Sequence, residues 1–259
     1  EHGREVVRIP EAVHVGLAQG QFAGEEEAGE DLLVADMDVC VGAVLAALDT
    51  VRDPELDTSI VELGFVTACS VGDDGTARVR LRLPTYFCAP NFAFLIVADA
   101  YEAIAQVDGI VTVEVVLEDH FAADEINAGV AARAGFIASF DGLAENELDE
   151  LRRQFLRKAL LASQDRLVRP LLAAGVPPDH LGAMTIGDLP ASPDRERLRD
   201  RRIELGIPSS DDDPLLVHPD GLKVKADEVR LHLRRSRTVR MSIDANGEFC
   251  RQLLAQRYG

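Results

Sequence analysis

The chain has 259 residues, 47% of them hydrophobic, and this length allows one large or two ordinary domains. Its formal net charge of -18 is uneven, because residues 1–141 hold 26 acids and 7 bases while the remaining residues hold 19 acids and 20 bases. An acidic first half argues against nucleic acid as a partner, since phosphate neutralisation needs a basic surface. The sequence has no basic and apolar leader and no apolar run of membrane-spanning length, so we expect a soluble cytoplasmic protein without a membrane partner.

The first part of the chain changes character near residue 36. Residues 1–35 contain several glycines and an acidic run, and they predict an N-terminal tail or linker. From residue 36 the apolar positions are spaced as one face of a helix that ends near Arg52. Asp53, Pro54 and Glu55 then predict a turn or a short helix, because aspartate caps helices and proline suits the first helical position.

The next segment predicts a compact α/β domain over residues 36–121. Residues 64–71 and 77–83 read as strands, and the Gly- and Asp-rich residues 72–75 between them are typical of a hairpin turn. A helix over residues 92–106 and a strand over residues 111–117 follow, and strand, helix and strand in this order imply a parallel pair. The loop that holds Cys88 then lies at the carboxyl end of a strand, where open α/β sheets place ligands.

Residues 122–143 predict a connection with a short helix, and residues 144–259 a mostly helical C-terminal domain with a hairpin. The expected elements are a helix over 145–168 that Pro170 kinks or ends, a helix from Ser192 to Gly206, a hairpin over 215–224, a strand over 239–243 and a terminal helix over 247–258. The fold class is therefore α/β in the broad sense (α+β). The basic cluster Arg230, Arg234, Arg235, Arg237 and Arg240 predicts a solvated face or a seam with acidic residues.

Cys88 is the first candidate for function among four widely spaced cysteines. A thiol just before a helix feels unpaired backbone N–H groups and the helix dipole, which favour the nucleophilic and metal-binding thiolate. A small buried hydrophobic residue is the alternative interpretation. The other cysteines, Cys40, Cys69 and Cys250, are expected in the core, and the absence of any CxxC pair argues against a zinc ribbon or a disulfide framework.

Several ordered motifs match one known family. The matching residues are Asp53-Pro54-Glu55-Leu56, Ile60-Val61-Glu62-Leu63-Gly64-Phe65-Val66, Leu83-Pro84-Thr85-Tyr86 with Cys88 behind it, and Val107-Asp108-Gly109-Ile110. With them the segment from Leu48 to Leu117 resembles the small iron-sulfur cluster assembly domain of SufT, of the phenylacetate-pathway protein PaaD and of their eukaryotic relatives. The resemblance covers about a third of the chain.

This resemblance implies a non-enzymatic factor that loads iron or iron-sulfur clusters into client proteins. It implies that Asp53, Glu55, Thr85 and Cys88 handle the iron or the transient cluster, with no cofactor tightly bound. The usual Cys-Pro is Cys88-Ala89-Pro90 here, which shifts the thiol by one residue. The whole, longer chain resembles accessory proteins encoded with bacterial multicomponent diiron monooxygenases of the propane and phenol type, which implies such an oxygenase as the client.

A metal site is the most specific prediction for this loop. Cys88 and His120 are the expected metal ligands, with Asp53 and Glu55 nearby, because thiolate and imidazole suit iron or zinc and carboxylates suit iron. His120 follows the third strand, and of the two interpretations a lone surface histidine is favoured over a metal ligand. Asp53 and Glu55 are equally well interpreted as capping residues. One cysteine does not hold a cluster, so a homodimer or the client is expected to supply further ligands.

Two other functions fit the sequence. In one, Cys88 and His120 act as nucleophile and base of a cysteine-dependent hydrolase or transferase. In the other, the domain is a chaperone-like docking partner of the monooxygenase, and the shifted cysteine has no chemical role.

Overall fold

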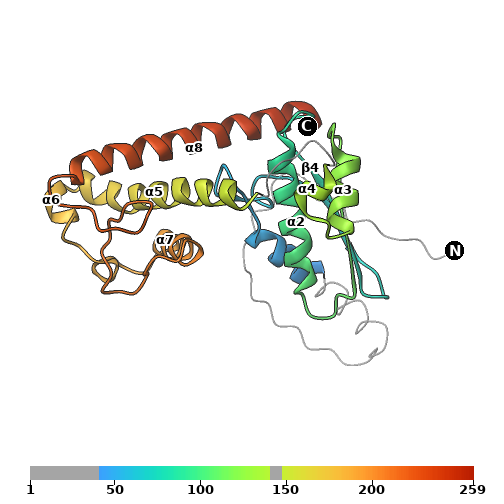
Figure 1. Cartoon of the computed structure of the whole chain (residues 1–259), viewed down its shortest axis with the longest axis horizontal. Helices are drawn as coiled ribbons and strands as arrows, with labels where there is room; N and C mark the ends of the chain where they lie inside the picture. The colour runs from blue at the N-terminus through green and yellow to red at the C-terminus, as the bar shows by residue number, and fades with distance from the viewer. Residues whose placement is uncertain (1–40, 141–147) are drawn as a thin grey trace, which may run out of the picture. The chain divides into compact units, whose positions relative to one another are not determined.

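A computed structural model of the chain describes residues 41–140 and 148–259 (Figure 1). The predicted tail over residues 1–35, the start of the first helix and Cys40 lie outside the described residues. The chain divides into two compact units. The described part of the first unit comprises residues 41–53, 58–140 and 251–259, and that of the second comprises residues 54–57 and 148–250.

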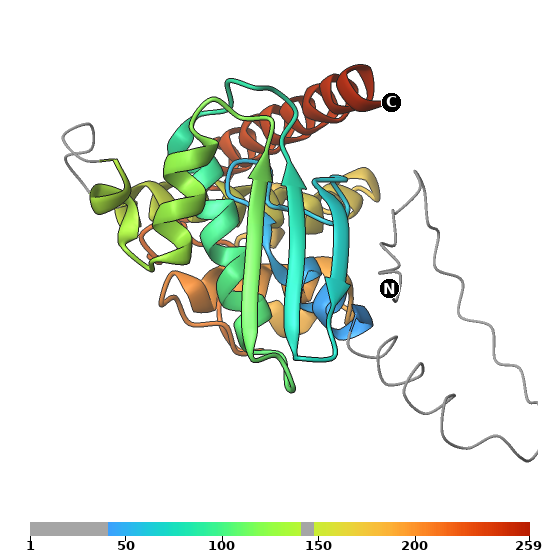
Figure 2. The same cartoon turned by 90° about the vertical axis from the view of Figure 1, so that its right-hand side faces the viewer.

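The first unit is built on a three-stranded sheet in the order β3-β4-β5 (Figure 2). Strands β3 (Val66–Val71) and β4 (Thr76–Arg82) are antiparallel and joined by the predicted turn, in which Gly75 has a φ of 72°. Strand β5 (Thr112–Glu118) pairs with β4 in parallel, from Thr76 opposite Thr112 to Arg82 opposite Glu118. The predicted hairpin and the predicted parallel pair are both present.

One face of this sheet is buried and the other is charged. Val79 and Leu81 of β4 are buried, whereas Arg78 and Arg80, which alternate with them, are exposed, as expected for a period of two. On the charged face Arg78 pairs with Glu114 of β5 at 3.0 Å. Arg82 and Arg80 both pair with Glu118 of the same strand.

Helices cover the buried face (Figure 2). Helix α2 (Pro90–Ala105) makes the crossover from β4 to β5, and α3 (Ala123–Ala131) packs with it against β5. A further helix over residues 41–50 and α4 (Gly135–Ser139) complete the unit, together with the two-residue strands β1 (Arg52–Asp53) and β2 (Thr58–Ser59). Residues 123–139, placed in a connection by the sequence, thus form two helices of the first unit.

The second unit is mostly helical. Its helices are α5 (Asp149–Ala173), α6 (Pro178–Leu181), the 3-10 turn η1 (Ile186–Asp188), α7 (Pro193–Glu204) and α8 (Val229–Tyr258), whose last eight residues belong to the first unit. Helix α5 and the first part of α8 run side by side (Figure 1) and are joined by hydrogen bonds such as that of Arg240 to Asp165 at 2.6 Å. Helix α7 begins as predicted at Ser192, whose hydroxyl accepts the Arg195 N–H.

A fully buried cation lies in the core of the second unit. Arg202 of α7 is fully buried, and its guanidinium donates to the backbone carbonyls of Pro208, Pro214 and Leu215. A buried charge is tolerated only when it is well hydrogen-bonded. These bonds hold the loop after α7 against apolar side chains that include Leu198, Leu160 and Val168.

The α+β fold class with a largely helical C-terminal region is confirmed, but three details of that region differ. The predicted strand over residues 239–243 is wrong, because these residues lie inside α8. The predicted hairpin over 215–224 doubles back but forms only an isolated bridge between Val217 and Lys223. Pro170 lies inside the last turns of α5 rather than ending it, and the helix closes at Gly175, whose φ is 87°.

Within the described parts of the chain, no helix is both long enough and apolar enough to cross a membrane.

Candidate functional site

Cys88 lies in the loop between β4 and α2, at the carboxyl end of β4 as the sequence predicts. Helix α2 begins at Pro90, whose fixed φ suits the first helical position, with Ala89 as the N-cap. Cys88 is half-buried, and its sulfur lies 3.4 Å from the Thr85 hydroxyl. The loop therefore closes on itself through the thiol and the preceding threonine.

His120 contacts this loop and is buried, with 5% of its surface exposed. Its Nε2 lies 2.7 Å from the Cys88 carbonyl oxygen, and its Nδ1 accepts the Ala122 N–H at 3.2 Å. Because Nδ1 is an acceptor, Nε2 carries the proton and donates a hydrogen bond to the Cys88 carbonyl oxygen. Burial lowers the pKa of His120, the hydrogen bond to Cys88 opposes this, and the positive charge of Arg257 lowers the pKa further.

This position changes the interpretation of His120. The expectation of a lone surface histidine is wrong, because the ring is covered and stacks on Phe121 with centroids 5.0 Å apart. Both ring nitrogens hold backbone groups, so ligation of a metal by His120 would require one of these hydrogen bonds to break. In this arrangement His120 fixes the backbone at Cys88 and does not contact the thiol as a base.

Three aromatic side chains around Cys88 are exposed, which the sequence analysis missed. They are Tyr86 and Phe87 on the loop and Phe121 next to His120, and Phe87 is 77% exposed. Their ring centroids lie 5.0 to 6.3 Å apart. The signal in the sequence was an aromatic pair directly before the cysteine. Exposed aromatic clusters mark surfaces that bind other proteins.

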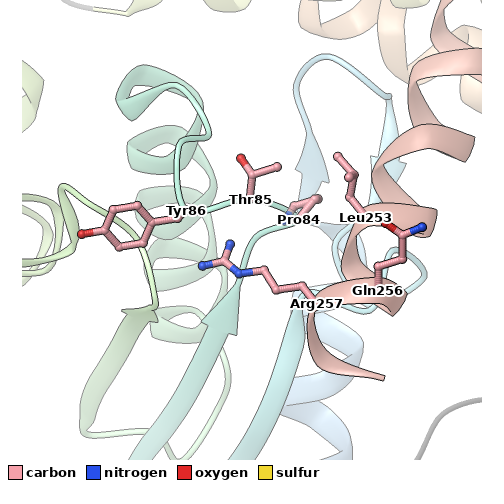
Figure 3. Close-up of a pocket in the computed structure, with 6 residues that line it drawn as sticks. All are labelled: Pro84, Thr85, Tyr86, Leu253, Gln256 and Arg257. Carbon is pink, nitrogen blue, oxygen red and sulfur yellow. The ribbon is translucent and has the colours of Figure 1, made fainter.

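A shallow pocket of about 390 Å³ adjoins the same loop (Figure 3). It lies within the first unit, between the loop and the last residues of α8, and its lining residues are Pro84, Thr85, Tyr86, Leu253, Gln256 and Arg257. Thr85 thus contributes to the pocket wall and also contacts the Cys88 sulfur. Sequence motifs could not reveal this pocket, because one wall lies far along the chain.

The acidic motif is divided between the units. Asp53 lies in β1, which pairs with β2, so the predicted turn is present but Asp53 is a strand residue and does not begin a helix. Glu55 belongs to the second unit and accepts a hydrogen bond from Asn246 at 3.2 Å. In residues 41–140 and 148–259, no group of three or more His, Cys, Asp or Glu side chains is arranged to hold a metal ion.

The other described cysteines differ in environment. Cys69 of β3 is buried as predicted, and burial raises the pKa of its thiol to about 11. A thiol of that pKa stays protonated near neutral pH and is chemically inert. Cys250, predicted in the core, is half-buried on α8. Cys88 therefore combines partial exposure with a place at the carboxyl end of a strand.

Known proteins resemble part of this chain. A family model described as iron-sulfur cluster assembly protein matches residues 42–115. An uncharacterized protein of Methanocaldococcus jannaschii is 34% identical over 84 residues, which make up 32% of this chain and 86% of that protein. The crystal structure of a domain of unknown function, DUF59, from Bacillus anthracis is 23% identical with a TM-score of 0.31, and the match covers 39% of this chain and 95% of that chain.

The family match includes Cys88 and the motifs around it. The resemblance to iron-sulfur assembly domains is confirmed, whereas the resemblance to accessory proteins of diiron monooxygenases stays a prediction. The family model ends at residue 115, so His120 and the second unit lie beyond it. Through residues 42–115, the chain belongs to the iron-sulfur cluster assembly protein family.

Proposed function

We propose that this protein is a non-catalytic maturation factor that assists the insertion of iron or an iron-sulfur cluster into a client metalloprotein. The observation that carries the proposal is the half-buried Cys88, held at the carboxyl end of β4 and surrounded by exposed aromatic rings. A thiol of this kind is a suitable ligand for iron in transit, and the rings offer a surface for the client. Asp53, Glu55 and Thr85 stay proposed contributors to handling that iron.

The missing metal ligands would come from another protein. One thiolate does not hold a cluster, so the client, or a second copy of this chain in a homodimer, would complete the coordination. We further propose a diiron monooxygenase as the client, which rests on the predicted resemblance of the whole chain. The cytoplasmic location also stays a prediction.

The decisive experiment compares Cys88→Ser with the wild type in cells that otherwise lack the protein. Iron content and activity of the client should fall with Cys88→Ser, because the oxygen of serine is a poor substitute for a thiolate toward iron. Cys250→Ser, which changes another half-buried cysteine, is the matched control and should leave both unchanged. Iron retention by the anaerobically purified proteins gives an independent reading.

A docking role without metal chemistry is the second candidate, because the exposed aromatic cluster does not depend on the thiol. In that case Cys88→Ser would bind the client and support its activity like the wild type, whereas Phe87→Ala would weaken binding. The third possibility, a cysteine-dependent enzyme, has less support. His120 would have to serve as the base, yet its Nε2 proton is donated to the Cys88 carbonyl.

A further inference from the structure

The last residues of α8 bind Asp119, the residue that precedes His120. Arg257 Nη2 lies 2.6 Å from the Asp119 carboxylate and donates to the Asp119 carbonyl oxygen at 2.9 Å. The Tyr258 hydroxyl donates to the same carboxylate at 2.8 Å. All of these residues belong to the first unit. Two neighbouring side chains thus hold both the backbone and the side chain of a single residue.

Asp119 has a backbone conformation that needs such support. Its φ is 53°, in the left-handed region that residues other than glycine rarely adopt. Such a conformation persists where surrounding contacts fix it, and it clusters at functional sites. The hydrogen bond from the Tyr258 hydroxyl has the largest effect on the pKa of Asp119 and lowers it. The charge of Arg257 lowers it further, so the pKa lies below its usual range despite partial desolvation. The carboxylate is therefore a charged acceptor at neutral pH.

Tyr258 is itself held in place by two cations. The guanidinium carbons of Arg82 and Arg257 each lie 5.0 Å from the centre of its ring, a distance typical of cation–π contacts. Arg82 also pairs with Glu118, the last residue of β5, at 3.1 Å. Burial, and then the Asp119 carboxylate, raise the pKa of Tyr258 to about 12. Its hydroxyl therefore stays a donor under physiological conditions.

The contacts continue from Asp119 to the Cys88 loop. His120 Nε2 donates to the Cys88 carbonyl at 2.7 Å. The N–H of Phe121 donates to the Tyr86 carbonyl at 3.1 Å. The two residues directly after Asp119 therefore hold the backbone of the loop at Tyr86 and at Cys88. Figure 3 shows Arg257 reaching from the end of α8 toward the same loop.

We propose that Arg257 and Tyr258 are positioning residues for the Cys88 loop. By fixing Asp119 they place His120 and Phe121 at hydrogen-bonding distance from the loop backbone. The inference rests on the proposed function for its purpose, since an ordered loop presents the thiol and the aromatic rings together. Arg257 and Tyr258 lie outside the family match, on a helix that begins in the second unit, and in this proposal they keep the Cys88 loop ordered.

The test uses the full-length protein with Arg257→Ala, Tyr258→Phe and Arg257→Lys. The first readout is the hydrogen-exchange rate of the Phe121 amide. The second is the rate at which iodoacetamide alkylates Cys88, measured on the peptide that contains Cys88 so that the other cysteines do not contribute. Both rates should rise in the first two variants, for Arg257→Ala about tenfold, the factor expected when a hydrogen bond to a charged group is lost. Arg257→Lys keeps the charge and should recover part of the effect, which a general loss of packing would not show.

Arg237→Ala is the matched control, because it removes an exposed arginine earlier on the same helix. It should leave both rates at the wild-type values. The inference is overturned if Arg257→Ala and Tyr258→Phe, at an unchanged Tm, leave both rates unaltered, or if Arg237→Ala alters them equally. These readouts need no client. If Cys88→Ser proves silent in cells while Arg257→Ala loosens the loop, the metal-handling proposal fails and the positioning role stands.

Discussion

Each unit buries a histidine in a polar network, but the two networks end in different places. In the second unit His232 is buried, and its Nε2 lies 3.1 Å from the side-chain oxygen of Gln164, which is fully buried. The Gln164 amide also binds both the N–H and the carbonyl of Val217, at 3.0 and 3.1 Å. Every partner in this network is itself inside the protein.

In the first unit the network of His120 ends at the surface. Its hydrogen bond to the Cys88 carbonyl supports a half-buried thiol and a loop with exposed rings. A buried histidine therefore has no single role in this protein. Where the groups it holds are enclosed, its effect is on stability; where they carry exposed side chains, it also sets what the surface presents.

The largest expected effect is that of Gln164→Ala. This change leaves the N–H and carbonyl of Val217 and the ring of His232 without their buried partner. Each unsatisfied buried group costs about 1–3 kcal/mol, so we expect a loss of about 4 kcal/mol in the free energy of unfolding. Urea denaturation measures it. Arg169→Ala, at an exposed position on the same helix, should change little, and a similar loss there would contradict the importance of the network.

The second effect is a dependence of stability on pH. Burial first, then the charges of His218 and Arg235, lower the pKa of His232 to about 4 in the folded protein. The unfolded chain, with an ordinary histidine pKa of about 6.5, binds the proton first as the pH falls. The contribution of neutral His232 to the free energy of unfolding is therefore fully present above about pH 6.5. It is lost as the pH falls toward 4, by at most about 1.4 kcal/mol per pH unit and roughly 3 kcal/mol in all.

His232→Gln isolates this contribution, because glutamine does not titrate. Thermal or urea unfolding between pH 4 and pH 7 should show a shallower loss of stability for His232→Gln than for the wild type. The carboxylates and His120 are the same in both proteins, so only the difference between the two curves reports on His232. Parallel curves would mean that His232 is not held neutral by the network.

Local patterns predicted the parts of the fold that local interactions determine. The hairpin turn before β4 follows from its glycines and aspartates, and the parallel pairing of β4 and β5 follows from the helix between them. The place of Cys88 at the carboxyl end of β4 followed from the same order of elements. Ser192 began α7 because its side chain can accept a backbone N–H regardless of tertiary context.

Predictions failed where distant contacts decide the outcome. Val239, Met241 and Ile243 alternate like a strand, but in α8 only Ile243 is buried, and Gly247 lies buried within the helix rather than before it. Short apolar runs fit either period, and tertiary packing decides between them. His120 and Cys88 are far apart in sequence, so no motif could show that the histidine binds the backbone of the loop and not the thiol.

The smallest effect on stability, and the one that separates the two networks, is that of His120→Ala. It removes partners from the buried Ala122 N–H and from the carbonyl of the half-buried Cys88, where water can replace part of the loss. We expect a cost of about 2 kcal/mol, at roughly 1 kcal/mol for each hydrogen bond. Unlike Gln164→Ala, it should also speed the alkylation of Cys88, because the loop loses its anchor. His180→Ala, at an exposed histidine, is the control and should change neither quantity. If His120→Ala destabilised the protein without changing the reactivity of Cys88, His120 would be a core residue of the same kind as His232, and the distinction between an enclosed and a surface-directed network would be lost.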